Sequence, residues 1–127
     1  MSDDQHERGM KVRREVLGDE WVDAAIDRTT PFTAEFQDLI TRYAWGEIWT
    51  RPGLDRHTRR AITITALVAQ GQLEELAMHV RAALRDGMSA DDVKEVLLQT
   101  AIYCGVPAAN SAFAVAQKVL AEEGGGG

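Results

Sequence analysis

Residues 73–105 constrain the fold more than any other part of the chain. The first half of this stretch, LEELAMHVRAALRDG, has apolar residues at helical spacing. This stripe consists of Leu73, Leu76, Ala77, Val80 and Leu84. The second half, MSADDVKEVLLQTAIYCG, starts with Ser89 as an N-cap and Asp92 as its capping-box partner, and then continues at the same spacing. We therefore predict two helices that are joined by a tight reversal.

The rest of the chain has the same periodicity, and no segment shows the alternation of a strand. We expect helices at about 6–17, 19–27, from 33 to about 47, 55–70, 73–87, 89–105 and from 107 onward. Glycine or proline separates most of these segments. The fold class is therefore all-α, a bundle of about six to seven helices. At 127 residues, we expect one domain over 1–127, with flexible ends at about 1–8 and 122–127.

Composition narrows the class of protein. A net charge of −6 disfavours a general nucleic-acid surface, because binding to a phosphate backbone needs clustered lysine and arginine. No apolar run approaches the roughly 18 residues of a membrane span, and the first residues lack the apolar core of a signal peptide. We expect a cytoplasmic protein without membrane or nucleic-acid partners. The single cysteine, Cys104, excludes an internal disulfide and a CxxC redox pair.

Glu75 and His79 are the first candidates for chemistry. They stand four residues apart, so they lie one above the other on a helical stripe beside the apolar one. Ala82 and Ala83 share that flank and leave room beside the imidazole. A carboxylate and an imidazole in this arrangement are able to move a proton. The alternative is a solvated histidine and an ordinary surface pair.

Glu47 and Arg60 are charged residues that continue apolar stripes. Glu47 extends the line formed by Phe36, Leu39, Ile40 and Tyr43, and Arg60 precedes Ile64 on the next helix. Burying either charge without a partner is costly. One interpretation is that the two pair with each other or with a subunit neighbour. The other is that Arg60 binds a substrate carboxylate through two parallel hydrogen bonds.

Three further patterns bear on partners. Trp45 and Trp49, four residues apart, either wall a pocket or pack in the core. Several helices carry apolar residues on two sides, which indicates an oligomer with one face for the core and one for a neighbour. Neither zinc-ligand spacing nor a glycine-rich phosphate loop after a strand is present. We therefore expect neither a metal nor a nucleotide cofactor.

Three blocks together resemble the carboxymuconolactone decarboxylase family of the alkylhydroperoxidase-D-like superfamily. They are TRYAWGEIWTRPGLDRHTRR, LEELAMHVRAALRDG and VKEVLLQTAIYCGVPAANSAFAVA, and the likeness covers about residues 9–120. The resemblance implies an all-helical fold of that superfamily and a ring-shaped homo-hexamer built from dimers. It also implies cofactor-free decarboxylation of 4-carboxymuconolactone (2-carboxy-5-oxo-2,5-dihydrofuran-2-acetate) to 3-oxoadipate enol-lactone. That reaction belongs to the protocatechuate branch of the β-ketoadipate pathway, which degrades aromatic compounds.

The sequence also departs from the peroxidase members of the superfamily. Those proteins carry CxxC with a histidine four residues after the second cysteine. Aligned on His79, the two cysteine positions fall at Gln72 and Glu75. Their proton-relay glutamate aligns with Arg60, so a base replaces an acid. Disulfide chemistry is therefore absent, while the histidine is retained.

The resemblance and the substrate suggest roles for the substrate-binding residues. We expect Arg60, and more weakly Arg51, to hold the carboxylate that stays on the lactone. The carboxylate that leaves is expected in drier surroundings, against Trp45 or Trp49, where loss of charge is favoured.

The proton donor is expected to be His79, with its protonated form supported by Glu75. Glu47 is the alternative donor, with a pKa that burial would raise. Two alternatives to this function remain open. One is a decarboxylase or isomerase acting on a related lactone or β-keto acid. The other is a non-catalytic or thiol-redox helical oligomer in which Cys104 is the sensor.

Overall fold

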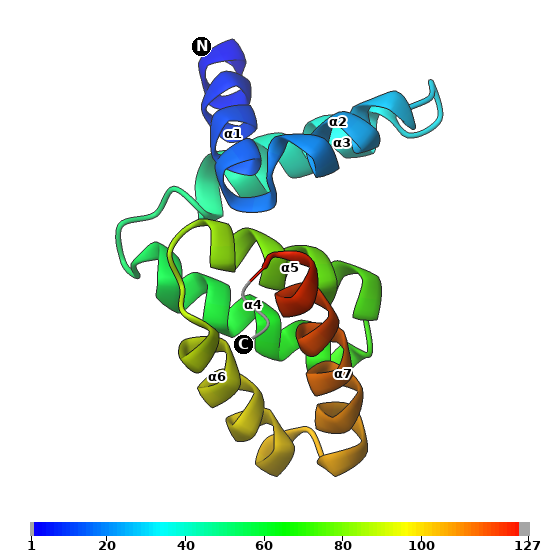
Figure 1. Ribbon diagram of the computed structural model, residues 1–127. Helices are drawn as coiled ribbons and strands as arrows, with labels where there is room; N and C mark the ends of the chain where they lie inside the picture. The colour runs from blue at the N-terminus through cyan, green and yellow to red at the C-terminus, as the bar shows by residue number, and fades with distance from the viewer. Residues whose placement is uncertain (1, 125–127) are drawn as a thin grey trace. The chain divides into compact units, whose positions relative to one another are not determined.

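The computed structural model describes residues 2–124, and every regular element in this range is a helix (Figure 1). The elements are α1 (Ser2–Leu17), α2 (Asp19–Asp27), α3 (Ala34–Ile40), the π-helix η1 (Thr41–Ile48), α4 (Arg56–Gln70), α5 (Leu73–Arg85), α6 (Ala90–Tyr103) and α7 (Val106–Glu122). The predicted all-α class is confirmed. None of the described helices combines the length and the hydropathy that crossing a membrane requires.

The chain forms two compact units, the first ending at Asp55 and the second beginning at Arg56. The expectation of a single domain stays a prediction. Residues 2–8, which we placed in a flexible end, belong to α1. The other predicted end is helical through Glu122, while Met1 and residues 125–127 lie outside the described residues.

The second unit is a four-helix arrangement in which α5 packs against α4 and α7, and α6 packs against α7 and α4 (Figure 1). Its core consists of apolar side chains from all four helices and from the turn between α5 and α6: Ile64, Val68, Leu76, Val80, Ala83, Met88, Val93, Leu97, Ala112, Ala116 and Val119. The small residues of α7 contribute three buried alanines, which allow close approach of neighbouring helices. This unit holds both Arg60 and His79.

The reversal between α5 and α6 has the expected local chemistry. Gly87 adopts a φ of 96°, and the Met88 N–H donates to the Ala83 carbonyl oxygen over 3.0 Å, which ends α5. The Ser89 hydroxyl then accepts from the Asp92 N–H at 2.9 Å and completes the predicted capping box. The turn therefore fixes where α5 stops.

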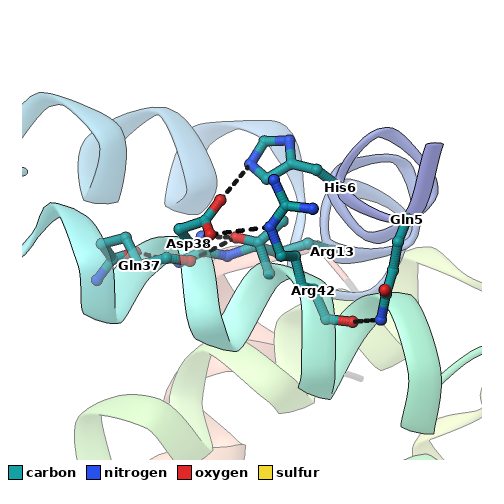
Figure 2. A network of polar contacts seen from close by, with 7 residues as sticks. Gln5, His6, Arg13, Gln37, Asp38 and Arg42 are labelled. Atoms are coloured by element: carbon teal, nitrogen blue, oxygen red, sulfur yellow. Dashed lines mark hydrogen bonds and ion pairs between the residues drawn. The ribbon is translucent and has the colours of Figure 1, made fainter. Parts of the chain in front are cut away.

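The first unit depends on close contact between α1 and η1. A Cβ atom on Gly9 would overlap the Thr41 carbonyl oxygen, and one on Gly46 would lie 2.8 Å from the Gln5 carbonyl oxygen. Buried Arg13 donates to the Thr41 hydroxyl at 3.2 Å, which strengthens this contact, and to the side-chain oxygen of Gln37 at 3.0 Å (Figure 2). Glycine is required at this crossing because the two backbones meet directly.

The prediction of one continuous α-helix from 33 to about 47 was wrong after Ile40, where the π-helix begins. A π-helix has more residues per turn, so the expected apolar stripe loses its register. The buried residues of η1 are Thr41, Trp45 and Gly46. Tyr43 and Glu47 of the expected stripe lie on η1 and are exposed, Tyr43 to 57%. Phe36 and Leu39 precede the π-helix on α3 and are each 59% exposed, which its register does not explain.

Candidate active site

Arg60 is the most deeply buried charged side chain among the described residues. It lies on α4 in line with Ile64 and Val68, and only 1% of its surface is exposed. Its Nη2 atom donates to Oδ2 of Asp86 at 3.2 Å. Burial lowers the pKa of Arg60, while the Asp86 carboxylate partly restores it. The core of the second unit therefore contains a fixed guanidinium.

His79 lies on the buried side of α5, 6% exposed. Its Nδ1 atom is buried and has no hydrogen-bond partner among the described residues. Burial, and then the positive charge of Arg60, lower the pKa of His79 from 6.5 to about 4. The imidazole is therefore neutral at pH 7 in the chain without a ligand.

Asp86, the ion-pair partner of Arg60, is a site residue that the sequence did not reveal. It follows α5 directly, and its backbone N–H donates to the carbonyl oxygens of Ala82 and Ala83 at 3.0 and 3.2 Å. Nε2 of exposed His57 lies 3.4 Å from the Asp86 carbonyl oxygen. Asp86 comes seven residues after His79, two helical turns along the same face. That spacing was the available signal.

Arg60, His79 and Asp86 are thus brought together by α4 and α5, whereas Glu75 is not part of the group. Glu75 is exposed in the first turn of α5. Within the described residues, no hydrogen bond or ion pair joins it to His79. Glu75 therefore does not contact His79 in this structure, and its support of a protonated imidazole stays a prediction.

The remaining predicted site residues belong to the first unit. Trp45 and Trp49 stack with ring centroids 5.4 Å apart at an interplanar angle of 24°. Glu47 and Arg51 are exposed. The substrate-binding and proton-donating roles of these four residues stay predictions.

Three other features of the described residues bear on function: metal-binding groups, the thiol and an apolar groove. No three His, Cys, Asp or Glu side chains among residues 4–124 are grouped so that they would hold a metal ion. Cys104 is a free, partly exposed thiol at the end of α6. An apolar groove of about 560 Å³ runs between α4 and α6, lined by Ala61, Ile62, Thr65, Glu95, Val96, Gln99, Thr100 and Tyr103.

An all-helical chain with a buried guanidinium beside a neutral imidazole defines a class of candidate acid–base enzymes for an anionic substrate. Comparison with known proteins narrows this class. The chain belongs to the carboxymuconolactone decarboxylase family, whose pattern matches residues 34–118. The family expected from the three sequence blocks is confirmed.

Three relatives illustrate the family. The chain is 43% identical over 125 residues to a 4-carboxymuconolactone decarboxylase of Acinetobacter baylyi, covering 98% of this chain and 93% of that protein. It is 42% identical over 123 residues to the nitrosuccinic acid decarboxylase npaB of Metarhizium robertsii, covering 94% and 86%. A 4-carboxymuconolactone decarboxylase of Pseudomonas putida is 46% identical over 43 residues, 34% of this chain and 90% of that sequence.

Proposed function

We propose that the chain is a carboxy-lyase that converts 4-carboxymuconolactone to 3-oxoadipate enol-lactone and carbon dioxide. The observation that carries the proposal is the buried Arg60 guanidinium whose charge acts on His79. A fixed cation is suited to a substrate with two carboxylates, and an imidazole is suited to the proton transfer that must follow loss of carbon dioxide. The similarity to decarboxylases over nearly the whole chain supports the same reaction.

In the first step the bond between the lactone ring and one carboxylate breaks. The electron pair of that bond moves through the unsaturated lactone to the ring carbonyl oxygen, which gives a dienolate and carbon dioxide. The substrate is its own electron sink. Arg60 holds the carboxylate that stays, since the planar guanidinium matches a carboxylate through two parallel hydrogen bonds.

In the second step a proton is delivered to a ring carbon of the dienolate, and His79 is the proposed donor. His79 has a pKa of about 4 in the free chain, so it must first gain a proton. The negative charges of the bound lactone promote this protonation, because an opposite charge within a few ångström raises the pKa of an imidazole. His79 takes a proton from solvent as the dianion binds, donates it to carbon, and returns to the neutral form.

A homo-oligomer, expected as a hexamer of three dimers, is part of the proposal. Large apolar side chains of the second unit are exposed in the single chain: Ile62, Leu98, Ile102, Tyr103 and Val106. Large exposed apolar side chains, where they gather into a patch, are typical of a protein interface. Sedimentation should give six times the 14.0 kDa of one chain. A monomer at micromolar concentration would contradict it. The cytoplasmic location stays a prediction.

A second candidate function is decarboxylation of a nitro-substituted dicarboxylic acid. The chain is nearly as similar to the nitrosuccinic acid decarboxylase as to the carboxymuconolactone decarboxylase. A nitro group next to the carbon that loses its carboxylate accepts electrons as the lactone carbonyl does. Such a substrate would need the same guanidinium and the same proton donor.

The test supplies purified protein with freshly generated 4-carboxymuconolactone, and in parallel with nitrosuccinate, without added cofactor. Loss of lactone absorbance and release of carbon dioxide are followed together. We expect both with the lactone, at a rate that a metal chelator and the Cys104→Ser exchange leave unchanged. Carbon dioxide release from nitrosuccinate alone would favour the second candidate. Release from neither substrate would reject both.

A further inference from the structure

We propose that Asp86 is a positioning residue that holds the Arg60 guanidinium beside His79. The inference rests on the proposed function of the same site and adds a residue to it. The Arg60 side chain is 1% exposed and that of Asp86 is 44% exposed, and Nη2 of Arg60 lies 3.2 Å from Oδ2 of Asp86. A long side chain in the core is thus anchored by a carboxylate that stands at the surface.

Asp86 itself is firmly placed by the end of α5. Its N–H is bonded to the carbonyl oxygens of Ala82 and Ala83, and Gly87 reverses the chain directly after it. Arg60, in contrast, has several rotatable bonds, and ordering them is entropically costly. A fixed acceptor reduces the number of positions that the guanidinium can occupy.

The anchor directly follows the helix that carries the proton donor. Asp86 is the C-cap of α5, seven residues after His79, and α5 packs against α4, which carries Arg60. Asp86 therefore sets the position of Arg60 relative to His79. A displaced guanidinium would no longer meet the carboxylate that stays, which weakens substrate binding.

This role predicts a particular pattern of kinetic change. Arg60 binds the carboxylate that stays, and that interaction is the same in substrate and transition state. Losing it raises KM and leaves kcat nearly unchanged. The side-chain oxygen of asparagine still accepts a hydrogen bond from Nη2, whereas alanine offers no acceptor.

The experiment compares Asp86→Ala, Asp86→Asn and the control Asp91→Asn in the full chain. Asp91 is 88% exposed and pairs with Lys94 at 3.4 Å instead of with Arg60, so its exchange removes the same charge without removing the acceptor of Arg60. For lactone turnover, we expect Asp86→Ala to raise KM at least about tenfold with kcat within about threefold. Asp86→Asn should keep KM within about threefold of the wild-type value. The control Asp91→Asn should stay within the same range.

An unchanged KM in Asp86→Ala would overturn the positioning role. A rise in KM in Asp86→Asn as large as that in Asp86→Ala would also overturn it. Should the alanine variant not fold, Asp86→Ser is used in its place. Serine remains polar after α5 but is too short to reach Nη2, so the same rise in KM is expected.

Binding of succinate separates this inference from the proposed function, because it needs no turnover. Succinate is a small dicarboxylate, and its dissociation constant is measured for each variant by NMR titration. We expect Asp86→Ala to weaken binding at least about tenfold and Asp86→Asn to restore it. This pattern without lactone turnover would reject the function and retain the positioning role. Equal binding by wild type and Asp86→Ala, or binding by neither, would overturn the role.

Discussion

The Arg60 guanidinium acts on His79 within the core of the second unit and lowers the pKa of its imidazole, in addition to the larger effect of burial. A buried cation next to a neutral imidazole is unfavourable to protonation until an anion arrives. The charge of the substrate is then what makes His79 an acid. Binding and proton uptake become a single event.

Removing the charge of Arg60 should raise the pKa of His79. Arg60→Met keeps a long unbranched side chain and deletes the cation, so the imidazole loses its unfavourable neighbour. NMR titration of the His79 ring should therefore show a higher pKa than in the wild type. Arg85→Met is the matched control, since Arg85 lies on α5 but pairs with Glu123 at 2.8 Å. An identical His79 pKa in Arg60→Met and wild type would show that the two groups do not interact.

Replacing His79 by glutamine should lower lactone turnover at least about a hundredfold, because a general acid contributes on that scale. The loss should appear mainly in kcat, while circular dichroism remains that of the wild type. His6→Gln provides the same exchange in the first unit, where the ring lies 3.6 Å from Asp38. We expect that control to keep full turnover. Near-normal kcat in His79→Gln would remove His79 as the proton donor and direct attention to Glu47.

Much of the fold could be predicted because the helices are punctuated locally. Gly18, Gly71 and Gly105 separate helices where expected, and the capping box at Ser89 forms as its sequence indicates. The π-helix could not be predicted in this way. It lies in direct contact with the α1 backbone at Thr41, and apolar spacing does not encode such a tertiary contact.

The site was predicted only in part, because spacing along the chain describes single helices and not how they pack together. Spacing placed Arg60 in line with Ile64 and identified His79 as an unusual residue on α5. It did not reveal Asp86, since an ion pair between helices depends on how α4 packs against α5. It also suggested that Glu75 would support His79, whereas the structure buries one and exposes the other.

The unfolding free energy of the chain should decrease as the pH is lowered, because of His79. Its folded pKa of about 4 lies below the ordinary value of 6.5, so the unfolded chain binds the proton more readily. This contribution is present above about pH 6.5 and is lost as the pH falls toward 4. Between pH 7 and 4.5 the wild type should lose roughly 2–3 kcal/mol more unfolding free energy than His79→Gln. Parallel urea midpoints for the two proteins across this range would contradict the burial of a neutral imidazole.

The contact of α1 with η1 should not tolerate a methyl group at Gly9. A Cβ there would overlap the Thr41 carbonyl oxygen, which is backbone and has little freedom to move. We expect Gly9→Ala to lower the unfolding free energy by about 2 kcal/mol or more, on the scale of overpacked cores. Gly53→Ala is the control, because a Cβ on Gly53 meets nothing within 4 Å. Urea unfolding that gives equal stabilities for both variants would refute the close crossing.

The pH dependence of lactone decarboxylation by the wild type, followed from pH 5 to 8, tests the central claim most directly. If binding of the dianion drives proton uptake by His79, kcat/KM should fall about tenfold for each unit of rising pH throughout this range, because the free imidazole has a pKa of about 4. The kcat itself should stay level until the pH passes the higher pKa of His79 in the complex. A kcat/KM that does not change from pH 5 to 8 would contradict proton donation by His79.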